Sequence, residues 1–147
     1  MLDLIDRQNK STTYIAYDTT IEADLTSAST VDVYGSIKGK VTIGSLLSVH
    51  GNIIGQVETN DLIIRYNGQI NGDCHCFFDC LIDQEGKMIG NIDCHSIEIK
   101  GHIRGNVIAQ ENVIIRKGGN VDGNITCRSL VVDDGGIING AVRLVYR

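Results

Sequence analysis

The chain has 147 residues, enough for one domain with a buried core. Its 17 glycines, five tyrosines, two phenylalanines and lack of tryptophan favour a core of aliphatic and small side chains. The net charge is −5 and the 13 basic residues are scattered, which argues against a nucleic-acid-binding surface. No apolar run is long enough to span a membrane, and no signal-peptide core begins the chain. Five cysteines, an odd number, then predict free thiols and a cytoplasmic location.

Residues 1–18 are predicted to form an N-terminal tail that is partly disordered. The tail opens with a small apolar tip formed by Met1, Leu2, Leu4 and Ile5, and continues with a polar stretch. Such a tip has two interpretations: a weak membrane contact that a polymer would multiply through avidity, or an unstructured start of the chain. Asp3 and Asp6 oppose binding to an anionic membrane surface.

From residue 19 onward the chain is a repeat, in which the pattern Gly-x-apolar-x-Gly occurs seven times at intervals of 15 to 18 residues. The glycine pairs are Gly35/Gly39, Gly51/Gly55, Gly68/Gly72, Gly86/Gly90, Gly101/Gly105, Gly119/Gly123 and Gly136/Gly140. The apolar residues between them are Ile37, Ile53, Ile70, Met88, Ile103, Val121 and Ile138. A degenerate earlier unit places Thr19, Ile21, Ala23 and Leu25 in the same frame. The repeat therefore comprises about eight units.

Two further apolar columns complete each unit. Two residues after the second glycine stand Val41, Val57, Cys74, Ile92, Val107, Ile125 and Val142. Before the next unit, apolar residues alternate with period two, as in a strand with one buried face. These pairs are Val31/Val33, Leu47/Val49, Leu62/Ile64, Cys80/Ile82, Ile97/Ile99, Val113/Ile115 and Leu130/Val132. Each unit thus predicts three short strands.

A single unit is too short to bury its own apolar residues, whereas stacked units about 4.8 Å apart enclose a continuous interior. The sequence therefore predicts an all-β domain over residues 19–147: a single-stranded, right-handed parallel β-helix, or triangular solenoid, of about eight coils. The irregular intervals and the preference of parallel strands for right-handed crossovers favour this hand over the left-handed, strictly hexad-based helix of acyltransferases.

The ordered set of motifs resembles the bactofilins, a family of bacterial cytoskeletal proteins. The resemblance starts at Thr13-Tyr14-Ile15-Ala16 and runs through every glycine unit to Gly136-Ile137-Ile138-Asn139-Gly140-Ala141-Val142. It implies a right-handed β-helix that polymerises end to end without nucleotide. It also implies filaments at the inner face of the cytoplasmic membrane that act in cell shape or localise cell-wall or envelope proteins. The tip at residues 1–5 resembles the membrane-targeting peptides of some members. Ala23 departs from the family pattern, because a glycine is usual there.

The cysteine cluster invites a metal-binding interpretation, since thiolates and imidazoles are the ligands of zinc. The register opposes it, because Cys76, Cys94 and Cys127 share a column with Ile43, Thr59, Ala109 and Leu144, and Cys74 falls in an all-apolar column. These positions predict small buried core residues, with no metal and no cofactor. The column of Asn91, Asn106 and Asn124 predicts a hydrogen-bonded corner ladder.

The four histidines, His50, His75, His95 and His102, share no column, which argues against the acyltransferase alternative. The leading hypothesis is therefore a non-enzymatic scaffold that assembles with itself. A monomeric binding module, whose apolar face recruits a partner, stays open as a third class.

The ends of the repeat predict self-association, because a stacked β-helix leaves unpaired backbone groups at each end and nothing evident caps this one. The candidate polymer-interface residues are Val142, Leu144 and Tyr146 at the C-terminal end, and Ile15, Ile21 and Leu25 at the other end. An apolar stripe of outward residues, Ile63, Leu81, Ile114 and Val131, predicts a lateral contact. That contact would be side-by-side association or cover by a terminal segment, and the alternative is scattered exposed aliphatic residues.

Overall fold

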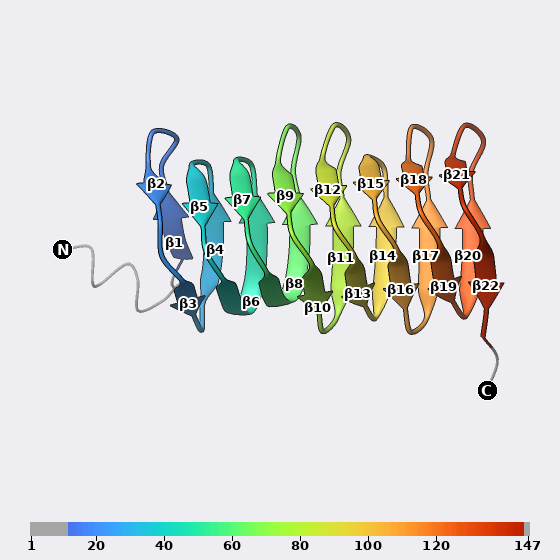
Figure 1. Cartoon of the computed structure of the whole chain (residues 1–147), viewed down its shortest axis with the longest axis horizontal. Helices are drawn as coiled ribbons and strands as arrows, with labels where there is room; N and C mark the ends of the chain where they lie inside the picture. The colour runs from blue at the N-terminus through green and yellow to red at the C-terminus, as the bar shows by residue number, and fades with distance from the viewer. Residues whose placement is uncertain (1–11, 146–147) are drawn as a thin grey trace.

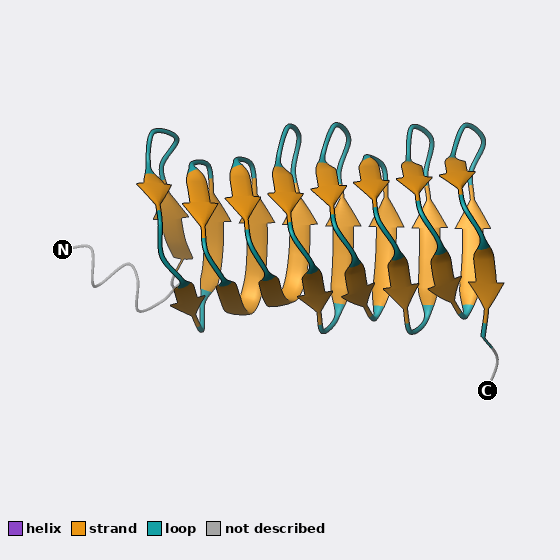
Figure 2. Cartoon of the chain, in the orientation of Figure 1, coloured by secondary structure: helices purple, strands orange, loops and turns teal. Residues whose placement is uncertain are grey.

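The structure is a computed structural model that describes residues 12–145 of the chain. All regular structure in this range is β, in twenty-two short strands that pair in parallel (Figure 2). The chain winds into a rod, with the first and last described coils at opposite ends (Figure 1). The prediction of a parallel β-helix of about eight coils is confirmed.

Three faces give the rod its triangular section. Face A contains β1 (Thr12–Ile15), β4 (Thr30–Val33), β11 (Asp79–Ile82), β14 (Ser96–Ile99), β17 (Asn112–Ile115) and β20 (Ser129–Val132). Face B contains β2 (Thr20–Ile21), β5 (Ser36–Lys38), β7 (Asn52–Ile54), β9 (Gln69–Asn71), β12 (Lys87–Ile89), β15 (His102–Arg104), β18 (Asn120–Asp122) and β21 (Ile137–Asn139). Face C contains β3 (Leu25–Ser27), β10 (Cys74–Cys76), β13 (Ile92–Cys94), β16 (Val107–Ala109), β19 (Ile125–Cys127) and β22 (Val142–Leu144).

Two longer strands, β6 (Val41–Val49) and β8 (Val57–Ile64), bend from face C into face A. They join these two faces into one 14-stranded sheet, whereas face B is a separate sheet of eight strands. A register shift in the pairing of β6 with β8, between Ile43 and Leu46, marks the bend.

The coil is right-handed. In Figure 1 the strands of face A rise at the back, those of faces B and C descend at the front, and the chain advances from left to right. This hand agrees with the strong preference of parallel crossover connections.

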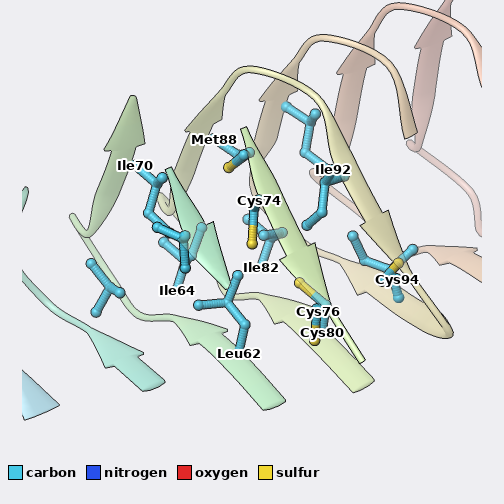
Figure 3. Packing of buried hydrophobic residues seen from close by; sticks show 14 of the residues in the cluster. Leu62, Ile64, Ile70, Cys74, Cys76, Cys80, Ile82, Met88, Ile92 and Cys94 are labelled. Atoms are coloured by element: carbon cyan, nitrogen blue, oxygen red, sulfur yellow. The ribbon is translucent and has the colours of Figure 1, made fainter. Parts of the chain in front are cut away.

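The predicted columns are the columns of the structure. Ile37 pairs with Ile53 and Ile53 with Ile70, and the same register continues coil by coil to Val121 and Ile138. These side chains point inward and join the other apolar columns in one continuous core, part of which Figure 3 shows. Parallel in-register stacking therefore turns a repeat of the sequence into a layered interior.

The second glycine of each unit lies at a close approach between neighbouring coils. Gly55 has a φ of 142°, and a Cβ added there would lie 2.1 Å from the carbonyl oxygen of Gly39 in the preceding coil. No other residue type fits such an approach without separating the coils. Ala23 is tolerated at the start of this column because it belongs to the first coil, and its φ is not positive.

The asparagine column forms the predicted ladder along one corner. The backbone N–H of Asn106 donates to Asn91 Oδ1 (2.9 Å), and that of Asn124 donates to Asn106 Oδ1 (3.0 Å). Asp73 begins the ladder by accepting from Asn91, and Ala141 ends it by donating to Asn124. Each rung satisfies a backbone donor at a turn, which confirms the prediction.

The β-helix begins earlier than residue 19. Strand β1 lies within the predicted tail, and it pairs with β4 so that Ile15 stands beside Val33. The first three residues of β1 are exposed, whereas Ile15 is buried and continues the inward column of face A. The boundary of the folded domain therefore includes Thr12–Ile15.

Candidate functional site

The C-terminal end of the rod is an open cross-section of the core. Val142 and Leu144 of β22 stand in register above Ile125 and Cys127. Their exposed fractions are 41% and 43%, whereas those of Ile125 and Cys127, one coil deeper, are 0% and 1%. The same apolar columns that are sealed inside the rod are thus open at its end. Tyr146, the third predicted residue here, lies outside the described residues.

The N-terminal end is better covered. Ile15 is only 5% exposed, and Ile21 and Leu25 are half-buried and pack against the core. Aromatic rings reinforce this end: Tyr14 contacts Tyr34 with ring centroids 5.0 Å apart. The two ends therefore differ, and the C-terminal end exposes more of the core columns.

Both ends also leave backbone groups available for pairing. Within residues 12–145, the terminal strands β20, β21 and β22 pair only on the side of the preceding coil. The first strands β1, β2 and β3 pair only on the side of the following coil. A second β surface in matching register would satisfy these donors and acceptors.

The predicted lateral stripe lies on the outside of face A. Ile63 alternates with buried Leu62 and Ile64, and Leu81 and Ile114 occupy the equivalent position in later coils. All three are half-buried and line one groove, whereas Val131 lies beyond it and is 49% exposed. The structure therefore brings three of the four predicted residues together.

The cysteines occupy the core, as their columns predicted. All five are free and buried, and Figure 3 shows four of them among the aliphatic side chains. Burial raises the pKa of the Cys76 thiol to about 12, and it raises the pKa of Cys74, Cys80, Cys94 and Cys127 as well. The carbonyl oxygens of Asn60 (3.2 Å) and Asp79 (3.1 Å) both lie within hydrogen-bonding distance of Cys76 Sγ, whose single S–H donates to one or the other. These thiols stay protonated and hence unreactive near neutral pH.

Within the described range, no group of three or more His, Cys, Asp or Glu side chains is arranged to hold a metal ion. That range also contains no helix with the length and apolarity needed to cross a membrane. The tip residues Met1, Leu2, Leu4 and Ile5 lie outside it.

The histidines are dispersed, as predicted. His102 lies on face B and His75 on face C, where its Nδ1 is 3.6 Å from Asp93. His95 lies in the turn between β13 and β14, and its ring nitrogen contacts Gln110 at 3.5 Å. No shared site forms among these three.

His50 takes part in a contact that the sequence alone did not indicate. Its ring stacks on Tyr34 with centroids 4.0 Å apart and an interplanar angle of 7°. Burial and nearby Arg65 lower the pKa of His50, so the ring is neutral at pH 7. The sequence contains both rings, but only the register of neighbouring coils shows that Tyr34 and His50 lie side by side.

One of three comparisons with known proteins found a match. A family model described as "Bactofilin: Polymer-forming cytoskeletal" matches residues 64–143, more than half of the 147-residue chain. Searches of the curated proteins and of the solved structures gave no match. The matched region ends in β22, so it includes the open C-terminal coil.

Proposed function

The chain belongs to the bactofilin family of polymer-forming cytoskeletal proteins, and from this premise we propose that it is a structural scaffold that assembles into filaments. Its β-helices stack end to end, and no nucleotide takes part. The subunit interior supplies rigidity, and the ends supply the contacts.

The open C-terminal coil is the observation that supports this proposal. Val142 and Leu144 are 41% and 43% exposed in columns that are otherwise sealed. Each is already more than half covered, so complete burial contributes about 1 kcal/mol per side chain. Backbone pairing along β20, β21 and β22 adds to this, because the strands of a second rod satisfy the outer row of donors and acceptors.

A charge placed in this cross-section tests the proposal. Leu144→Arg buries an unpaired guanidinium if a second rod stacks there, and we expect it to replace filaments by short or single particles. The matched control is Ile108→Arg, which puts the same side chain on the outside of face C, where Ile108 is exposed. Both variants should keep the β circular dichroism and melting curve of the parent. Undiminished filaments of Leu144→Arg in negative-stain micrographs would contradict the proposal.

We extend the proposal to location and cellular role on the basis of the family. The filaments act at the inner face of the cytoplasmic membrane, in cell shape or in localising envelope proteins. The apolar tip at residues 1–5 supplies a weak contact per subunit that the polymer multiplies. Co-sedimentation with liposomes should be lost when residues 1–5 are removed, while filaments persist. Equal sedimentation of both proteins would eliminate the tip as the membrane contact.

A further inference from the structure

A groove of about 450 Å³ crosses face A at the middle of the rod. Its floor is formed by the outward side chains of Ile63, Leu81 and Ile114, which share one column, and Leu46 lies beside them in the column of Asp61. The volume lies in the range of sites that hold small ligands or a few side chains of a peptide. The groove is on the side of the rod, away from both ends, so filament contacts leave it accessible.

Glu98 lies in the same outward column, between Leu81 and Ile114. Its Oε2 accepts a hydrogen bond from Arg116 Nε at 3.1 Å and lies 4.0 Å from Lys100 Nζ. Lys100 directly follows β14 and Arg116 directly follows β17, so both cations lie at the edge of face A. The carboxylate of Glu98 is therefore already paired where it lines the groove between Leu81 and Ile114.

The opposite edge of the groove is acidic. Asp79 begins β11 beside Asp61, which lies within β8, and Asp61 Oδ1 accepts the backbone N–H of Asp79 at 3.2 Å. Neither carboxylate forms an ion pair with a cation anywhere in residues 12–145. The lining of the groove contains three acidic residues and no lysine or arginine.

This charge distribution selects among possible occupants. The cations at the opposite edge, Lys100 and Arg116, are already paired with Glu98 and Asp133, so a second copy packed face to face offers its Asp61 and Asp79 either like charges or cations that are already neutralised. A segment with apolar side chains for the floor and cations for the acidic edge satisfies both features. We propose that the groove is a docking site for a partner's amphipathic peptide segment in which lysine or arginine alternates with apolar residues.

A synthetic peptide of alternating leucine and lysine, labelled with fluorescein, is the probe. We expect the full-length protein to bind it in fluorescence anisotropy, and not to bind a peptide of alternating leucine and glutamate. The double variant Asp61→Asn, Asp79→Asn should weaken binding about tenfold, since charge-assisted contacts are lost while an acceptor oxygen is retained at each position. Leu81→Ser should weaken it by a similar factor, because the centre of the floor is removed.

The matched control is Asp93→Asn, Asp122→Asn, which changes the net charge equally on faces C and B. Equal loss of affinity in this control would show general attraction to an acidic protein and overturn the proposal. Binding unchanged by both Leu81→Ser and the Asp61/Asp79 variant would also overturn it. If Leu81→Ser instead abolished lateral pairing of filaments and left peptide binding intact, the occupant would be a second copy. The binding measurement does not depend on assembly, so its failure leaves the filament proposal standing.

Discussion

Replacing Gly105 with alanine should separate two coils in the middle of the rod. Gly105 has a φ of 149°, and a Cβ there would lie 2.1 Å from the carbonyl oxygen of Gly90. Backbone strain at such a φ costs about 1–3 kcal/mol, and relieving the close approach costs about 1–3 kcal/mol more. We expect Gly105→Ala to lower the free energy of unfolding by about 4 kcal/mol, measured by urea denaturation below the concentration of assembly.

Gly118→Ala is the matched control. Gly118 also has a positive φ, 85°, but a Cβ there would lie no closer than 3.7 Å to another residue, the carbonyl oxygen of Lys100. Only the backbone strain is added, so the expected loss is about 1 kcal/mol. If the two variants lost the same stability, the close approach between coils would not be what requires glycine in the column, and the reasoning would be refuted.

Three further predictions concern turns, thiols and the corner ladder. Glu85 has a φ of 60°, a left-handed conformation that strains a residue with a Cβ. Glu85→Gly should therefore raise the free energy of unfolding by about 0.5–1 kcal/mol in denaturant titrations. A lower free energy of unfolding would show that this strain is absent. Burial raises the pKa of Cys76 to about 12 in the folded protein, above the ordinary thiol value of 9. The protonated thiol therefore contributes fully to the free energy of unfolding below pH 9, and this contribution should fall as the pH rises from 9 to 12. Cys76→Ala should make the free energy of unfolding fall less steeply between pH 9 and 12. An unchanged fall would show that Cys76 is not its source. Asn106→Ala should lower the free energy of unfolding by about 1 kcal/mol, because the N–H of Asn124 loses its acceptor. Asn106→Asp keeps an acceptor and should melt close to the parent. If Asn106→Ala melted at the same temperature as Asn106→Asp, the ladder would be refuted.

The interior of this fold was predictable because each coil repeats one local pattern. Once the glycines are aligned, the inward column from Ile37 to Ile138 and the burial of Cys76 and Cys94 follow from period-two alternation. Parallel stacking in register then fixes which residues become neighbours. The asparagine ladder was predictable for the same reason, since equivalent corner positions lie above one another.

The parts that escaped prediction depend on contacts between coils rather than on the pattern. Strand β1 is not preceded by a Gly-x-apolar-x-Gly unit, and only its pairing with β4 shows that it belongs to the sheet. Ser48 points outward by register, yet it is buried, because its hydroxyl lies within hydrogen-bonding distance of His50 and accepts from Arg65. The apolar stripe was predicted, but its acidic edge was not, because Asp61 and Asp79 become neighbours only through the pairing of successive coils.

Negative-stain microscopy of the purified full-length protein, with no nucleotide or metal added, tests the central claim most directly. Eight coils about 4.8 Å apart give a subunit length on the order of 40 Å along the rod. End-to-end stacking therefore predicts thin filaments with a subunit rise of about 40 Å in their averaged images. Single particles at every protein concentration, or filaments with a rise far shorter than the rod, would contradict the account.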